Sequence, residues 1–132
     1  MARPASDYPT GLELEILKIL WEQSPLPVRE VRDRLEAQAS RPLTHSSVIT
    51  VLNIMVRKGY LRRRKEGKAF LFSPKVEKQK VSGGIMGDVM ARLFDGSPSA
   101  MVLNLLETAD LDFEELQELR KLINRKAKEQ QK

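Results

Sequence analysis

The stretch "THSSVITVLNIMVRKGYLRRRKEGKAFLFSP", residues 44–74, is the most informative about the fold, because the spacing of its apolar residues changes partway along. In its first half, Val48, Leu52 and Met55 recur at the three- and four-residue spacing of one helix face. Thr44 is a suitable N-cap, and Gly59 is a suitable C-terminal stop. We therefore predict a helix from Thr44 to about Lys58.

After Gly59 the pattern is that of strands. The runs "YLRRRK" and "KAFLFS" flank a Glu66-Gly67 turn, which predicts a two-stranded hairpin. Phe70 and Phe72 lie on one face of the second strand, and Leu61 is a candidate for the facing strand. Pro74 ends the hairpin.

Upstream, the sequence predicts two further helices. Thr10 and Glu13 have the spacing of a capping box in front of a helix over about 11–23. Pro25 and Pro27 break this helix, and a shorter one follows over 28–39. Three helices and a hairpin predict a mainly α fold with a small β wing, a winged helix-turn-helix, over residues 1–74.

Residues 75–132 have a different character, with several short helices that are too apolar to stand alone. We expect a helical dimerisation region, in which Gly83 and Gly84 interrupt the first apolar stripe and the tail from Asn124 is frayed. The candidate contact residues are the apolar ones of these helices: Ile85, Val89, Leu93, Phe94, Val102, Leu106, Leu116, Leu119 and Ile123.

The composition excludes several classes of function. The chain has 132 residues, no cysteine and one histidine, so disulfides and thiolate chemistry are excluded and a metal site is not expected. Without a long apolar run or a leader-like N-terminus, we expect a cytoplasmic protein that does not insert into a membrane. His45 beside Ser46 and Ser47 does not make a catalytic set, because helix neighbours point in different directions, so we expect neither an enzyme nor a cofactor.

Charge is distributed unevenly along the chain. Residues 1–74 carry thirteen basic and eight acidic side chains, whereas residues 75–132 carry ten of each. The basic side chains in and just before the hairpin repel one another unless an anion offsets their charge. A nucleic-acid backbone is the natural anion. The alternative is a charged edge strand that merely blocks aggregation. The candidate phosphate contacts are Arg57, Lys58, Arg62, Arg63, Arg64, Lys65 and Lys68.

The helix at 44–58 offers short polar side chains on its outer face. Hydroxyl and amide groups of this size can reach base edges in a DNA major groove, and recognition helices use their N-terminal turns for this purpose. The alternative is an ordinary exposed helix face. The candidate base contacts are Thr44, His45, Ser46, Ser47, Thr50 and Asn53.

Three segments together carry a family resemblance: "LELEILKILWEQSPLPVREVRDRL" (12–35), the stretch at 44–74, and "FDGSPSAMVLNLLE" (94–107). From about residue 10 to 124 the chain resembles the BlaI/MecI family of penicillinase-type repressors. The resemblance implies a homodimeric repressor that binds palindromic double-stranded DNA operators. It also implies relief by a membrane-bound sensor protease that cuts after the Asn of a "VLNF" segment.

The matching residues here are "VLNL", with Leu105 in place of the family's Phe, so the candidate cleavage site is Asn104-Leu105. The alternative is that this segment is a plain interface helix. Two other functions stay open: a small-molecule-responsive winged-helix regulator, with Met86, Met90 and Met101 lining a pocket, and a winged-helix protein or RNA interaction module.

Overall fold

The computed structural model describes residues 8–131, and the statements below refer to these residues. The chain divides into two compact units between Gly87 and Asp88. This division lies further along the chain than the 74/75 boundary expected from composition, because the first turns of the helix after the hairpin belong to the first unit. The role of each part in binding or dimerisation stays a prediction.

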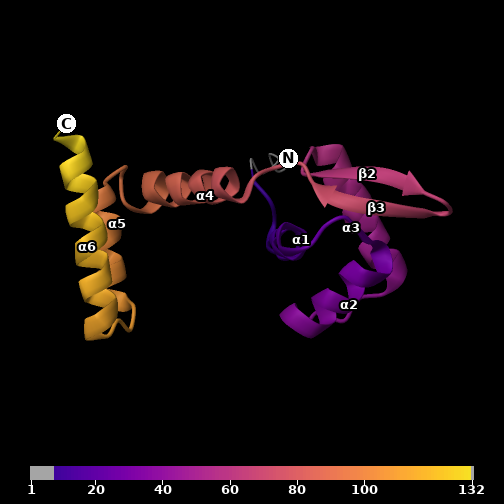
Figure 1. Cartoon of the computed structure of the whole chain (residues 1–132), viewed down its shortest axis with the longest axis horizontal. Coiled ribbons are helices and arrows are strands. Elements are labelled where there is room, and N and C mark those ends of the chain that lie inside the picture. Colours follow the sequence, from indigo (N-terminus) through magenta and orange to yellow (C-terminus); the bar gives the residue numbers. More distant parts are fainter. Residues whose placement is uncertain (1–7, 132) are drawn as a thin grey trace, which may run out of the picture. The chain divides into compact units, whose positions relative to one another are not determined.

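Three helices form the body of the first unit, and all three predicted helices are confirmed (Figure 1). They are α1 (Gly11–Glu22), α2 (Val28–Ala39) and α3 (His45–Lys58). The predicted capping box starts α1, with Thr10 N donating to Glu13 Oε1 at 2.9 Å and Glu13 N donating to Thr10 Oγ1 at 3.3 Å. Thr44 caps α3, and Gly59 ends it with the left-handed φ of 86°.

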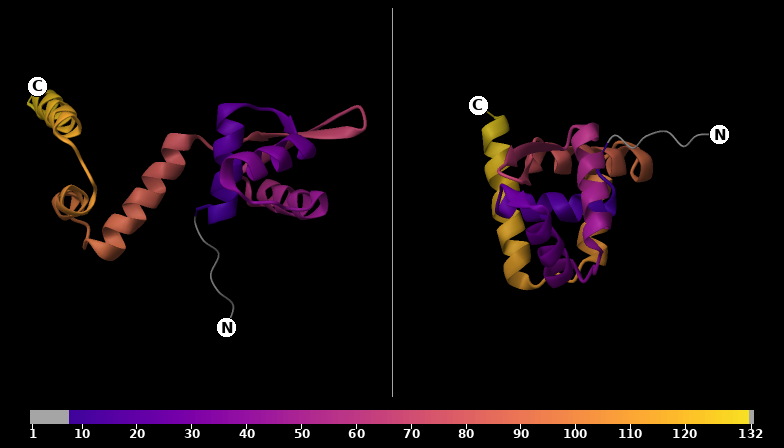
Figure 2. Two further views of the ribbon diagram at one scale, coloured as in Figure 1. Left: turned by 90° about the horizontal axis from the view of Figure 1, so that it is seen from below. Right: turned by 90° about the vertical axis from the view of Figure 1, so that its right-hand side faces the viewer.

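The hairpin is confirmed, but it belongs to a sheet of three strands. β2 (Leu61–Glu66) and β3 (Ala69–Pro74) pair antiparallel, and Gly67 adopts a φ of 63° in the turn between them. β1 (Leu26–Pro27) pairs with the other edge of β3, so the strand order is β1-β3-β2. The prediction missed β1 because a strand of two residues, one of them a proline, carries no alternating pattern. Figure 2 shows the hairpin extending past the helices, and we call β2, β3 and their turn the wing.

One hydrophobic core joins the helices to the base of the wing. Its members come from α1, α2, α3 and all three strands, and each is at most 4% exposed. They are Ile16, Leu17, Ile19, Leu20, Leu26, Val31, Leu35, Val48, Leu52, Met55, Leu61 and Phe72. The indole of Trp21 packs beside this core and donates to the carbonyl of Val76 at 2.9 Å. The hydrogen bond ties α1 to the segment that leaves the wing.

The remaining helices are α4 (Lys78–Leu93), α5 (Pro98–Thr108) and α6 (Phe113–Gln130). Helix α4 runs through Gly83 and Gly84 without a break. The expectation of a frayed tail from Asn124 is wrong: α6 continues to Gln130 because Arg, Lys, Ala, Glu and Gln all have good helix propensity. None of the three helices has a buried residue in the single chain. Among the described residues, no helix is long and apolar enough to cross a membrane.

Candidate nucleic-acid interface

The first turns of α3 present a row of exposed hydroxyl groups. Thr44 Oγ1 accepts the N–H of Ser47 at 3.1 Å and donates its own proton to Ser47 Oγ at 2.8 Å. One turn later, Thr50 Oγ1 donates to the carbonyl of Ser46 at 2.9 Å. Since Val48 and Leu52 anchor the opposite side of α3 in the core, this polar face stays turned outward.

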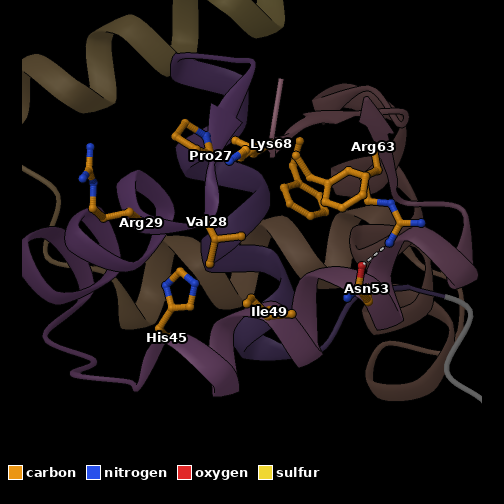
Figure 3. A pocket seen from close by; sticks show the side chains of 11 residues that line it. Pro27, Val28, Arg29, His45, Ile49, Asn53, Arg63 and Lys68 are labelled. Carbon is orange, nitrogen blue, oxygen red and sulfur yellow. Dashed lines mark hydrogen bonds between the residues drawn. The ribbon is translucent and has the colours of Figure 1, made fainter. Parts of the chain in front are cut away.

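A hollow of about 730 Å³ lies between α3, the wing and the start of α2 (Figure 3). Four predicted DNA contacts line it: His45 and Asn53 from α3, Arg63 from β2, and Lys68 from the turn. Its other lining residues are Pro27, Val28, Arg29, Ile49, Ala69, Phe70 and Phe72. The structure therefore brings part of the predicted recognition helix and part of the predicted wing to one concave surface with an apolar floor and basic groups.

Strand alternation divides the cations of the wing into two sets. Leu61, Arg63 and Lys65 occupy one face of β2, and Arg62 and Arg64 occupy the other. The face of Leu61 is the face turned to the core. All these cations are exposed, and Arg64 lies 3.3 Å from Glu66 Oε2 in an ion pair that is open to solvent. One flat array of phosphates therefore cannot meet all of them in the same way.

Lys58 is held by an acid. Its Nζ lies 2.8 Å from Oε2 of Glu13, whose side chain is only 5% exposed, whereas the Lys58 side chain is 43% exposed. Burial raises the pKa of Glu13, but the hydrogen bonds from Lys58 and Thr10 and the charge of Lys58 together outweigh burial, so the pKa lies below its ordinary value of 4.5. The pair joins the end of α3 to the start of α1, and a structural role of this kind was not predicted for Lys58.

All seven predicted phosphate contacts are exposed. Four of them are Arg57 at the end of α3 and Arg62, Lys65 and Lys68 of the wing. Within the described part of the chain, no carboxylate lies within ion-pair distance of any of the four. These cations keep their full charge available for an external anion. Arg63, by contrast, is engaged with Asn53 and Phe70.

The candidate cleavage residues lie in the middle of α5. Asn104 and Leu105 are exposed, and the carbonyl of Asn104 accepts a hydrogen bond from Thr108 Oγ1 at 2.7 Å. The nine predicted dimerisation residues are half-buried or exposed, with Leu93 reaching 74% and Ile123 60% exposure. Residues 8–131 contain no group of three or more histidine, aspartate or glutamate side chains that could hold a metal ion.

Sequence reasoning missed two parts of this surface. Arg29 lines the hollow from the first turn of α2, and Pro27 and Val28 supply part of its apolar lining. The signal was present in the basic residue next to Val28, but its approach to the wing depends on the pairing of β1 with β3. The pairing of Glu13 with Lys58, 45 residues apart, had no local signal.

Comparison with known proteins supplies the family. The family model described as "Penicillinase repressor" matches residues 9–125. The chain is 30% identical to the penicillinase repressor of Bacillus licheniformis over 111 residues, covering 84% of this chain and 85% of that one. It is 25% identical to the methicillin resistance regulatory protein MecI of Mammaliicoccus sciuri over 117 residues, covering 89% and 94%.

Among solved structures, the chain is similar to the Bacillus licheniformis BlaI monomeric form in complex with the blaP half-operator. The identity is 27%, the TM-score is 0.45, and the match covers 54% of this chain and 84% of that one. The match to the family model extends over both the winged-helix part and the C-terminal helices. The chain belongs to the penicillinase repressor family.

Proposed function

We propose that this protein is a homodimeric transcriptional repressor that binds a palindromic DNA operator and acts without catalysis. The observation that carries the proposal is the concave surface on which the polar face of α3 meets the basic wing. The names of its relatives, a penicillinase repressor and a methicillin resistance regulatory protein, support the same function.

In this proposal, the two sides of the surface have different tasks. The polar face of α3 approaches base edges, where each good contact discriminates against a wrong base by about 1 to 3 kcal/mol. Its residues are Thr44, His45, Ser46, Ser47 and Thr50. Arg57, Arg62, Lys65 and Lys68, four cations without an acidic neighbour among residues 8–131, bind phosphates. If a dimer neutralises roughly eight phosphates, a plot of the logarithm of affinity against the logarithm of salt concentration has a slope of about −7.

The C-terminal helices supply the second copy in this proposal. Their apolar side chains lack cover in the single chain, and a second copy brings the same surfaces to them. Dimerisation then places two α3 helices on the two half-sites of one duplex. Cleavage at Asn104-Leu105 by a membrane-bound sensor protease divides this region and empties the operator. Because the bond lies inside α5, cutting it requires that α5 first unwinds locally.

A gel-shift and footprinting experiment tests the central proposal. We expect a palindromic footprint and a steep loss of affinity with salt. Ser47→Ala changes the preference among operator variants, whereas Lys65→Ala weakens operator and random duplex alike. A protein that prefers single-stranded or A-form RNA, or equal losses for both variants on both duplexes, contradicts the division of tasks.

One observation favours a second candidate, a regulator that releases DNA when a small molecule binds. The hollow beside α3 combines an apolar floor with basic groups, and a ligand there competes with DNA for the same surface. Mass spectrometry of the protein after release in cell extract separates the mechanisms. Fragments that end at Asn104 and begin at Leu105 support proteolysis, whereas an intact chain supports the ligand.

A further inference from the structure

Arg63 makes two contacts, one with the recognition helix and one within the wing (Figure 3). Its Nη1 donates to Oδ1 of Asn53 on α3 at 2.8 Å. The carbon of its guanidinium lies 4.7 Å from the centroid of the Phe70 ring on β3, within the range of a cation–π contact. We propose that Arg63, Asn53 and Phe70 form a latch that sets the position of the wing on α3, so that Arg63 is a positioning residue of the interface. This inference rests on the proposed DNA binding.

The location of the latch explains why it matters. The wing is anchored in the core at its base by Leu61 and Phe72, and everything from Arg62 to Phe70 is exposed. A two-stranded hairpin is only marginally rigid by itself. Lys65 and Lys68 lie beyond the latch toward the turn, so a small change of direction at Arg63 moves these two cations away from their phosphates.

The latch also fixes which hydrogen-bonding group of Asn53 is available. With Oδ1 occupied by Arg63, the side chain of Asn53 has its amide hydrogens left to offer. In a major groove these donors match acceptors, such as N7 and O6 of guanine or O4 of thymine. Arg63 therefore contributes to sequence choice through Asn53, in addition to holding the wing.

Asn53→Ala is the sharpest test, because Asn53 carries no charge. If Asn53 only contacts a base, its loss lowers affinity but leaves the salt dependence unchanged. If it holds the latch, wing cations lose phosphates, and the salt slope becomes shallower by about one or more per subunit. Thr50→Ala is the matched control on the same helix: it removes a neutral polar group outside the latch, so it changes operator affinity without changing the slope.

A measurement on the free protein separates the latch from DNA binding. Hydrogen exchange of the wing amides becomes faster by about fivefold in Asn53→Ala, in line with the loss of one exposed charge-assisted contact. Asn53→Asp keeps an acceptor for Arg63, so its wing amides exchange as slowly as those of the wild type. Phe70→Leu removes the ring but keeps an apolar side chain, and it gives an intermediate rate.

The outcomes are distinct. Faster wing exchange in Asn53→Ala than in Asn53→Asp, together with a shallower salt slope in Asn53→Ala than in Thr50→Ala, supports the latch. Unchanged exchange and an unchanged slope in Asn53→Ala overturn it. A wild-type protein that does not bind duplex DNA refutes the proposed function, whereas the exchange comparison of Asn53→Ala with Asn53→Asp still decides whether the wing is latched.

Discussion

The two parts of the chain treat apolar side chains in opposite ways. In the winged-helix unit, twelve hydrophobic residues are at most 4% exposed and close one core. In α5 and α6, large side chains such as Phe113, at 74% exposure, and Leu103, at 55%, face outward. The first part therefore closes its own core, whereas the second leaves large apolar side chains exposed in the single chain, which agrees with the proposed dimerisation.

We expect the largest effect from a truncation after Gly87, which removes the second unit. The remaining chain keeps the core, so it stays folded, but we expect its operator affinity to fall by about 10² to 10⁴ because the second half-site is no longer bound in an intramolecular step. Fluorescence anisotropy on a labelled operator measures this loss, and circular dichroism controls for folding. An operator affinity equal to that of the full chain contradicts a role for the C-terminal helices.

The next largest effect is expected from leucines, which differ in kind between the core and the exposed helices. Leu52→Ala leaves a cavity under α3, and we expect it to lower the free energy of unfolding by about 2 to 5 kcal/mol at any protein concentration. Leu116→Ala, at a side chain 42% exposed, acts instead through association. Its effect on the urea midpoint of unfolding depends on protein concentration. Urea unfolding at several concentrations distinguishes the two, and a concentration-independent loss for Leu116→Ala argues against an interface there.

The ion pair of Glu13 gives a pH test confined to the first unit. Because the pKa of Glu13 is lower in the folded chain, the pair stabilises the protein above the unfolded pKa, and this contribution is lost as the pH falls through the folded pKa. Glu13→Gln removes the charge, and we expect a loss of about 1 to 2 kcal/mol at neutral pH. Thermal unfolding against pH should show a smaller acid loss in Glu13→Gln. Parallel curves for both proteins contradict this account.

The smallest effect is expected at the corresponding pair in the second unit. Lys121 Nζ lies 3.7 Å from Glu118 Oε1, with both side chains at least 70% exposed. Solvent screens this pair, so Lys121→Met changes the free energy of unfolding by less than about 0.5 kcal/mol. Urea unfolding at a fixed protein concentration measures the change. A loss as large as that of Glu13→Gln means that Lys121 is covered in the assembled protein.

The elements that the sequence predicted well are those that local rules determine. Thr10, Thr44 and Gly59 cap or end helices through contacts a few residues away, so the bounds of α1 and α3 follow from spacing alone. β1 forms only by pairing with β3, which lies far away in the sequence, and the local sequence at Leu26 and Pro27 does not predict that pairing.

The candidate site was predicted by residue type but not by arrangement. The polar face of α3 and the basic wing follow from pattern, whereas only the structure shows that His45, Asn53, Arg63 and Lys68 line one hollow. Contacts between distant parts of the chain decide which cations already have a partner in the protein. Lys58 forms an ion pair with Glu13, and Arg63 donates a hydrogen bond to Asn53. Local sequence cannot separate these two from Lys65 or Lys68.

The hydrogen bond from Trp21 to Val76 also makes the protein convenient to observe. The chain has one tryptophan, so its tryptophan fluorescence comes from a single residue. The indole lies beside the core and next to the segment that leads from the wing to α4. Emission from Trp21 therefore reports whether α1 and this segment remain joined, and it does so without a dye. With no native cysteine, a single engineered thiol elsewhere can carry an acceptor label for distance measurements from Trp21.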